Sequence, residues 1–225
     1  MVQIYALNIE KLPDPAEEPD VLAALAPARK EKTMKYCQAS DRKRSLGAGL
    51  LLLDILPRFG ADYKDVCLAA DGKPQVDGIC FNLSHSGSYV TCAVGKQPVG
   101  CDVEQVKKAP DRVAKHFFFE SEVRYIEKQG DQKDEAFFRI WTMKESYMKM
   151  TGEGIRLPLN EFEIFLLDEE YQRVLRDGKI QPCRIRSYEL PGYQVSVCTV
   201  ESDFAEEIEQ IRELRTTQNK EVTNE

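Results

Sequence analysis

Two carboxylates stand two positions apart in a short apolar run, Val99-Gly-Cys-Asp-Val-Glu104. Alternate side chains of a strand share a face, so Asp102 and Glu104 should point to one side together with Gly100. Neighbouring carboxylates repel each other and gain nothing from an apolar core. They suit either a solvent-exposed strand face or a shared cation. Magnesium fits the second case, because it takes one or two carboxylates and leaves room for substrate phosphates.

A predicted helix at 134–150 supplies a third acidic residue and two lysines. Its periodicity forms an apolar stripe in which Lys144 lies, while Glu145 and Lys149 lie along the border. A surface pair of Glu145 with Lys149, with Lys144 extending to water, is one explanation. The other is a helix edge beside an anionic ligand, with Glu145 toward a metal ion and the lysines toward phosphate.

A predicted hairpin, formed by strands at 79–84 and 89–94, presents Ser84 and His85 in its turn. A lone turn histidine is usually structural or merely exposed. Its hydroxyl and N–H neighbours nevertheless make this turn a possible phosphate contact.

Basic residues gather on two predicted helices, 27–37 and 40–56, with Ser40 expected to cap the second. They are Arg29, Lys30, Lys32, Lys35, Arg42, Lys43 and Arg44. A solvated face is the ordinary explanation, and an anionic ligand is the functional one. Lys73 adds a further cation in a turn. Glu122 is predicted in the first turn of a helix at 121–128. The helix dipole favours a carboxylate there, so capping of the helix alone could explain the presence of Glu122.

The net charge, the apolar stretches and the cysteines of the whole chain limit the classes of protein to which it can belong. Its 225 residues carry a net charge of −7, which argues against a general nucleic-acid binder. The longest apolar stretch, 50–56, is too short to span a bilayer, and the first ten residues do not read as a signal peptide. Seven cysteines without a Cys-x-x-Cys pair indicate reduced thiols. We therefore expect a cytoplasmic protein with neither membrane nor nucleic acid as a partner.

Helices and strands are grouped along the chain rather than alternating, which predicts the α+β class. Strands are expected at 99–104 and in four segments after residue 160: 161–167, 173–175, 183–188 and 194–199. The stretch that follows Glu104 is interpreted as a connection. The last twenty or so residues are interpreted as a short helix and a frayed tail.

Taken together, the motifs resemble the surfactin-synthetase-activating (Sfp) type of 4'-phosphopantetheinyl transferase over nearly the full chain. Their order and spacing carry the resemblance, since none would suffice alone. They are Gly72-Lys-Pro74, Phe81-Asn-Leu-Ser-His-Ser86, Pro98-Val-Gly-Cys-Asp-Val-Glu104, Phe118-Phe-Glu-Ser-Glu122, Trp141-Thr-Met-Lys-Glu-Ser-Tyr-Met-Lys149 and Gly152-Glu-Gly154.

The resemblance implies a fold and an activity. The fold would be two similar α+β halves related by a pseudo-twofold axis, 1–104 and 105–225, with a polar tail at about 216–225. The protein would be a monomer that binds coenzyme A between the halves. It would transfer phosphopantetheine to a serine of an apo carrier protein with magnesium, and release adenosine 3',5'-bisphosphate.

The resemblance also implies roles for single residues. Magnesium would be held by Asp102, Glu104 and Glu145. Coenzyme A would be bound by Arg29, Lys32, Arg44, Lys73, Ser84, His85, Lys144 and Lys149, where Arg29 replaces a common lysine. The base that takes the serine proton would be Glu145, with Glu122 as the second candidate.

Two other functions stay open at this level. One is a coenzyme A-binding module that has lost turnover, although Asp102, Glu104, Glu122 and Glu145 are all present. The other is a metal-dependent phosphatase or nuclease, which would leave the helix around Trp141 without a purpose. The stretch 112–124, with Arg112, Lys115, Arg124 and three phenylalanines, is a candidate surface for an acidic carrier helix. The sequence does not distinguish fatty-acid, polyketide and nonribosomal-peptide carriers.

Overall fold

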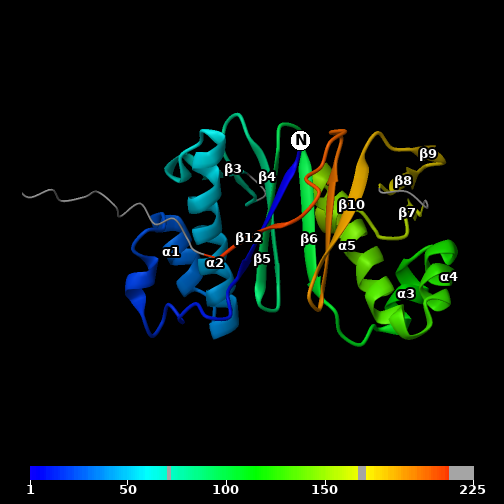
Figure 1. Ribbon diagram of the computed structural model, residues 1–225, viewed down its shortest axis with the longest axis horizontal. Coiled ribbons are helices and arrows are strands. Elements are labelled where there is room, and N and C mark those ends of the chain that lie inside the picture. The colour runs from blue at the N-terminus through cyan, green and yellow to red at the C-terminus, as the bar shows by residue number, and fades with distance from the viewer. Residues whose placement is uncertain (70–71, 167–170, 213–225) are drawn as a thin grey trace, which may run out of the picture.

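The computed structural model describes residues 1–69, 72–166 and 171–212, so the predicted tail at 216–225 lies outside the described residues. Two β-sheets lie side by side at the centre, with helix α2 beyond one sheet and helix α5 beyond the other (Figure 1). The mixture of grouped helices and sheets confirms the predicted α+β class. No helix in these three ranges is long and apolar enough to cross a membrane.

The first sheet has the strand order β12-β1-β5-β4. The strands are β1 (Gln3–Asn8), β4 (Cys80–Ser86), β5 (Tyr89–Gly95) and β12 (Glu209–Ile211). β1 pairs antiparallel with β5 and parallel with β12. The predicted short helix near the C-terminus is therefore wrong at 209–211, because that segment gains backbone partners on the open edge of β1. Strand β12 lies in the predicted second half of the chain, 105–225, but pairs with β1 in the first sheet. The division of the chain after Glu104 stays a prediction.

Helix α2 (Ala39–Ile55) packs on the outer face of the first sheet, and α1 (Pro27–Met34) packs on α2. Leu46, Leu51 and Ile55 of α2 are fully buried in one apolar cluster with strand residues such as Leu7 and Val90. The expected Ser40 cap is wrong: Gln38 occupies the N-cap and makes no side-chain capping hydrogen bond. Nearby, β2 (Cys67–Leu68) and β3 (Pro74–Gln75) form a small separate ribbon.

The second sheet has the strand order β10-β11-β6. Its strands are β6 (Val99–Gln105), β10 (Arg184–Leu190) and β11 (Tyr193–Thr199). The apolar face of β6 packs on the first sheet, where Cys101 and Val103 join one buried cluster with Ile4 and Ala93. The opposite face of β6, which carries the two carboxylates, therefore turns toward α5.

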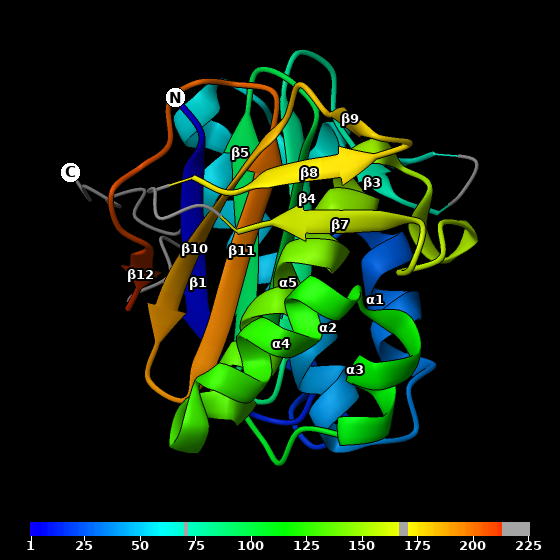
Figure 2. The same ribbon diagram turned by 90° about the vertical axis from the view of Figure 1, so that its right-hand side faces the viewer.

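Helix α5 (Lys133–Thr151) crosses the second sheet and ends at Gly152, whose φ of 73° is the left-handed conformation that glycine adopts readily. Two shorter helices pack beside it, α3 (Asp111–Phe117) and α4 (Glu120–Lys128) (Figure 2). The expected plain connection after Glu104 is wrong at α3, where Ala114 and Phe118 are buried against the α5 residue Phe137. A third sheet consists of β7 (Phe162–Phe165), β8 (Arg173–Arg176) and β9 (Lys179–Ile180).

Candidate active site

A cavity of about 360 Å³ lies where β4, β6 and α5 meet. Its lining residues are Leu83, Ser84 and His85 from β4, Asp102 and Glu104 from β6, and Trp141, Glu145 and Lys149 from α5. The α5 residues lie four positions apart, so they follow one face of the helix. The structure thus brings together six of the residues that the sequence singled out.

Gly100 allows α5 to approach β6 closely. A Cβ atom at this position would lie 2.0 Å from the Ser146 carbonyl oxygen and 2.4 Å from the Met150 amide nitrogen. Only a residue without a side chain fits at such a distance from backbone atoms. This close packing brings the last turns of α5 next to the carboxylates of β6.

Lys149 reaches from α5 to β6 and β4. Its Nζ lies 2.6 Å from Asp102 Oδ1, 3.0 Å from Ser84 Oγ and 3.1 Å from the carbonyl oxygen of Cys101. Burial is the largest influence on the pKa of Lys149 and lowers it, but attraction to Asp102, Cys101 and Glu145 and the hydrogen bond to Asp102 together outweigh burial, so the net pKa is raised. The cavity therefore contains a permanent cation among its carboxylates.

The carboxylates of the cavity influence one another. Burial raises the pKa of Glu145, and repulsion from Asp102 adds to the effect. Burial likewise raises the pKa of Glu104, although a hydrogen bond from Ser86 opposes the rise. Asp102 Oδ2 is buried and has no hydrogen-bond partner among the described residues. Among all the residues that the structure describes, no three aspartate, glutamate, histidine or cysteine side chains are grouped closely enough to hold a metal ion.

His85 lies within strand β4, paired with Val90, so its predicted place in the turn is wrong. The turn consists of Gly87 and Ser88 only, and Gly87 has a φ of 52°. Burial lowers the pKa of His85, and the nearby positive charge of Arg44 lowers it further. The Arg44 guanidinium donates a hydrogen bond to the Gly87 carbonyl oxygen at 3.3 Å. His85 and Arg44 are therefore neighbours beside the cavity.

Three further predicted cations do not line this cavity. Arg29 and Lys32 line a small space of about 100 Å³ with Tyr63, Leu68 and Pro74. Burial lowers the pKa of Lys32, and Arg29 adds to this effect. Lys73 Nζ lies 3.3 Å from the carbonyl oxygen of Lys149. The rest of the basic cluster is partly paired internally, as in the ion pair of Arg42 with Asp14.

Glu122 and Lys144 lie together in the interior instead. Both side chains are fully buried, and Lys144 Nζ is 2.9 Å from Glu122 Oε1. The ammonium also donates to the carbonyl oxygens of Leu159 and Phe162, at 2.9 and 2.6 Å. Neither residue lines the 360 Å³ cavity. The position of Lys144 within an apolar stripe is thus explained by a buried partner on α4.

Two residues of this region received no role from the sequence. Trp141 was named as the start of a family motif, without a role of its own, yet it lines the cavity. Ser86 donates a hydrogen bond to Glu104 Oε2 at 2.7 Å. The signal that could have identified Ser86 is the alternation of Asn82, Ser84 and Ser86, which places three polar side chains on one face of a strand.

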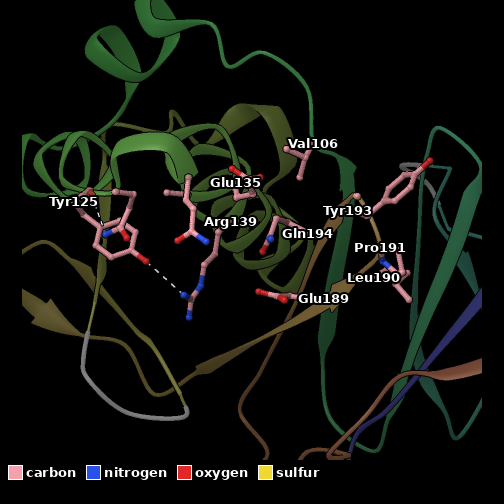
Figure 3. Close-up of a pocket in the computed structure, with 13 residues that line it drawn as sticks. Val106, Tyr125, Glu135, Arg139, Glu189, Leu190, Pro191, Tyr193 and Gln194 are labelled. Carbon is pink, nitrogen blue, oxygen red and sulfur yellow. Dashed lines mark hydrogen bonds between the residues drawn. The ribbon is translucent and has the colours of Figure 1, made fainter.

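A larger cavity, of about 660 Å³, lies between α4, α5 and the turn that joins β10 to β11 (Figure 3). Arg139 extends into it and donates a 3.4 Å hydrogen bond to the hydroxyl of Tyr125. Glu135 and Glu189 also line it, so acidic side chains outnumber the single arginine. None of the predicted site residues contributes to its wall. The predicted site residues therefore gather at the smaller cavity and not here.

Comparison with known proteins gives a consistent result. The profile of the 4'-phosphopantetheinyl transferase superfamily matches residues 98–198, which include β6, α5 and all of β11 but its last residue. Among solved structures, the holo-[acyl-carrier-protein] synthase of Thermotoga maritima aligns with a TM-score of 0.40 and 20% identity. That alignment covers 47% of this chain and 64% of the synthase chain.

Curated relatives extend the match beyond the profile. The 4'-phosphopantetheinyl transferase Sfp of Bacillus subtilis is 31% identical over 92% of this chain and 96% of its own. The transferase psf-1 of Bacillus pumilus is 40% identical over 75% of this chain and 76% of its own. HetI of Nostoc sp., also named a 4'-phosphopantetheinyl transferase, is 42% identical over 67% of this chain and 69% of its own. The family suggested by the motifs is confirmed, and this chain belongs to the 4'-phosphopantetheinyl transferase superfamily.

Proposed function

We propose that this protein transfers the 4'-phosphopantetheine group of coenzyme A to a serine of an apo acyl, peptidyl or aryl carrier protein. Adenosine 3',5'-bisphosphate would leave, and magnesium would be required. The observation that carries the proposal is the convergence of the Lys149 ammonium with Asp102, Glu104 and Glu145 on one cavity. Such a combination of cation and carboxylates is what a metal-bound pyrophosphate needs.

The donor chemistry of the residues present suits a magnesium ion, although the described side chains are not gathered into a ligand set without one. Asp102, Glu104 and Glu145 would hold it, and the unpartnered oxygen Asp102 Oδ2 is a buried acceptor that a cation would satisfy. Mutual repulsion among these carboxylates would also be relieved by a divalent charge. When bound, magnesium would neutralise negative charge on the pyrophosphate oxygens.

The cations of the site would bind the phosphates and the nucleoside. Lys149, Ser84 and His85 face the cavity that would receive the pyrophosphate. Arg29 and Lys32 line the space of about 100 Å³ with Tyr63, Leu68 and Pro74, and this combination of cations and flat apolar surfaces suits a 3'-phosphate beside the aromatic adenine ring. Two further cations would complete the contacts. Arg44 lies next to His85, and Lys73 donates to the carbonyl oxygen of Lys149 near the end of α5.

Glu145 is the base in this proposal. The serine oxygen would form a bond to the β-phosphorus, the bond from that phosphorus to the leaving nucleotide would break, and Glu145 would accept the serine proton. Burial raises the pKa of Glu145, which makes its carboxylate a stronger proton acceptor. Glu122 is poorly placed for this task because both of its oxygens accept buried hydrogen bonds, from Phe119, Ile164 and Lys144. We assign Glu122 and Lys144 a positioning role.

We propose helix α3 as the carrier-docking surface. Arg112, Lys115 and Phe117 are all exposed on it, and Phe117 is an aromatic residue with 42% of its surface accessible. An acidic carrier helix would find complementary charge and an apolar anchor there.

A single subunit supplies every residue in this proposal, which supports a monomer. We further propose that it acts in the cytoplasm, where its seven free cysteines would stay reduced. Light scattering coupled to gel filtration measures the subunit count.

Intact-mass spectrometry of apo carrier proteins, incubated with this protein, coenzyme A and magnesium, tests the activity. We expect a gain of one phosphopantetheine group, which EDTA or Asp102→Ala abolishes. No gain on any of several carriers, with coenzyme A still bound, would identify an inactive binding module. Release of phosphate from simple esters or nucleic acid without a carrier would identify a phosphatase or nuclease.

A further inference from the structure

The two central sheets meet at β4 and β6, each of which is the last strand of its own sheet. Side chains of β4 accept hydrogen bonds from backbone N–H groups of β6 at every second residue. The three bonds are Cys101 N–H to Asn82 Oδ1 at 2.8 Å, Val103 N–H to Ser84 Oγ at 3.3 Å, and Gln105 N–H to Ser86 Oγ at 3.1 Å. We call this set the edge ladder.

Two rungs of the edge ladder continue to a carboxylate. Ser84 Oγ donates to Asp102 Oδ1 at 2.8 Å, and Ser86 Oγ donates to Glu104 Oε2 at 2.7 Å. A hydroxyl has one proton, and its lone pairs can accept from an N–H group. Each serine therefore accepts from one residue of β6 and directs its proton to the carboxylate of the preceding residue.

The third rung lacks this extension. Asn82 accepts from Cys101, and the residue before Cys101 is Gly100, which has no side chain to orient. An amide oxygen is sufficient there, because only an acceptor is needed. The sequence thus places serine where a carboxylate must be held and asparagine where the strands are only joined.

We propose that Ser86 is a positioning residue, which fixes the Glu104 carboxylate in the orientation that binds the divalent cation. The inference rests on the proposed function, in which Glu104 is a metal ligand. Ser84 does the same for Asp102, but it also contacts Lys149, so its replacement would disturb two groups at once. Among the described residues, the Ser86 hydroxyl bonds only Glu104 and the Gln105 N–H, which makes its effect separable.

The physical reason lies in the flexibility of glutamate. Its carboxylate follows three rotatable bonds, and ordering them during metal binding costs conformational entropy. A hydrogen bond formed in advance removes part of that cost, and loss of such outer contacts typically weakens metal binding about 10- to 100-fold. The test therefore measures metal affinity directly.

The experiment titrates Mn²⁺ into the full-length protein and counts free ion by electron paramagnetic resonance, without a carrier protein. Ser86→Ala removes the hydroxyl, Ser86→Thr keeps it on a side chain suited to a strand, and Asn82→Ala removes the rung that has no carboxylate. Thermal unfolding of each variant is recorded in parallel, with and without Mn²⁺.

We expect Ser86→Ala to bind Mn²⁺ about tenfold or more weakly than the wild type, and Ser86→Thr to restore affinity. Asn82→Ala should lower the unfolding temperature but leave Mn²⁺ affinity unchanged. In the transfer assay, Ser86→Ala should need more magnesium for half-maximal rate and recover its rate at saturation.

Equal Mn²⁺ affinity in Ser86→Ala and wild type would overturn the inference, as would equal weakening in Ser86→Ala and Asn82→Ala. Failure of Ser86→Thr to restore affinity would overturn it too. The proposed function is tested by a different measurement, the modification of carrier proteins. If the wild type binds Mn²⁺ but modifies no carrier, the proposed transfer is refuted. The Mn²⁺ affinities of the variants would still show whether Ser86 positions Glu104.

Discussion

Lys144 Nζ lies 2.9 Å from Glu122 Oε1, and neither side chain is exposed to solvent. The ammonium has three protons and three oxygen acceptors, and the Phe162 ring lies 4.5 Å from it. The carboxylate in turn accepts from the N–H groups of Phe119 and Ile164. The pair therefore ties α5 to the start of α4 and to β7, and it helps to orient the face of α5 that lines the 360 Å³ cavity.

Breaking this pair should be costly because the remaining charge would be buried without compensation. We expect Lys144→Met to lower the free energy of unfolding by about 3–5 kcal/mol. Glu122→Gln combined with Lys144→Met should recover part of the loss, since no net charge then stays buried. Urea unfolding of both single variants and the double variant measures the coupling. Strictly additive losses would contradict the pairing.

Lys149 should contribute chiefly to the binding of coenzyme A. A charge-assisted hydrogen bond is worth about 1.5–3 kcal/mol, so we expect Lys149→Met to weaken coenzyme A binding about 10- to 100-fold. Isothermal titration calorimetry without a carrier protein measures the affinity. Lys179→Met, on exposed strand β9, serves as a charge-matched control and should bind normally. Equal affinities in the two variants would remove Lys149 from the phosphate site.

Reversal of charge on α3 should affect the carrier alone. We expect Arg112→Glu with Lys115→Glu to raise the KM for an acidic carrier about tenfold or more and to leave the KM for coenzyme A unchanged. The effect should shrink as salt is added, because exposed charges are screened. Steady-state kinetics at two ionic strengths provides the measurement. An unchanged carrier KM would place the docking surface elsewhere.

Gly100 should not tolerate a side chain. Gly100→Ala places a methyl group 2.0 Å from a backbone oxygen of α5, so helix and sheet must separate. We expect a loss of about 1–3 kcal/mol or more in unfolding free energy and a large loss of transfer activity. Gly49→Ala is the matched control, because its methyl would first meet Leu25 Cδ2 at 2.8 Å, the far end of a flexible side chain rather than the backbone. Circular dichroism melting compares the two; equal unfolding temperatures would argue against the close packing.

Acid should weaken the attachment of the loop that follows β1. A hydrogen bond from Arg42, with another from the Ala16 N–H, lowers the pKa of Asp14 from 3.8 to about 2. A lowered pKa stabilises the folded state above pH 4, and this contribution disappears as pH falls from 4 to 2. Wild type should therefore be more stable than Asp14→Asn at pH 6, and the difference should vanish near pH 2. Unfolding in urea at both pH values tests it.

Most of the elements were predictable because their signals are local. The hairpin before Gly95, the strand with Asp102, and α5 up to Gly152 follow from alternation, helical periodicity and glycine stops. Strand β12 and helix α3 were missed for a different reason. Residues 209–211 form a strand only because β1 offers an open edge, and α3 buries few residues, so its pattern is weak.

The sequence by itself determined the chemical groups: the spacing of Asp102 and Glu104, the helix that carries Glu145 and Lys149, and the motifs that identify the family. Tertiary structure decided which of these groups meet. From the sequence, Lys144 and Glu122 were candidates for the site just as Lys149 and Glu145 were. Because successive residues of a helix are rotated by about 100°, Lys149 faces the cavity and Lys144 faces α4. Contacts between distant segments depend on how helices and sheets pack, and no local spacing contains that information.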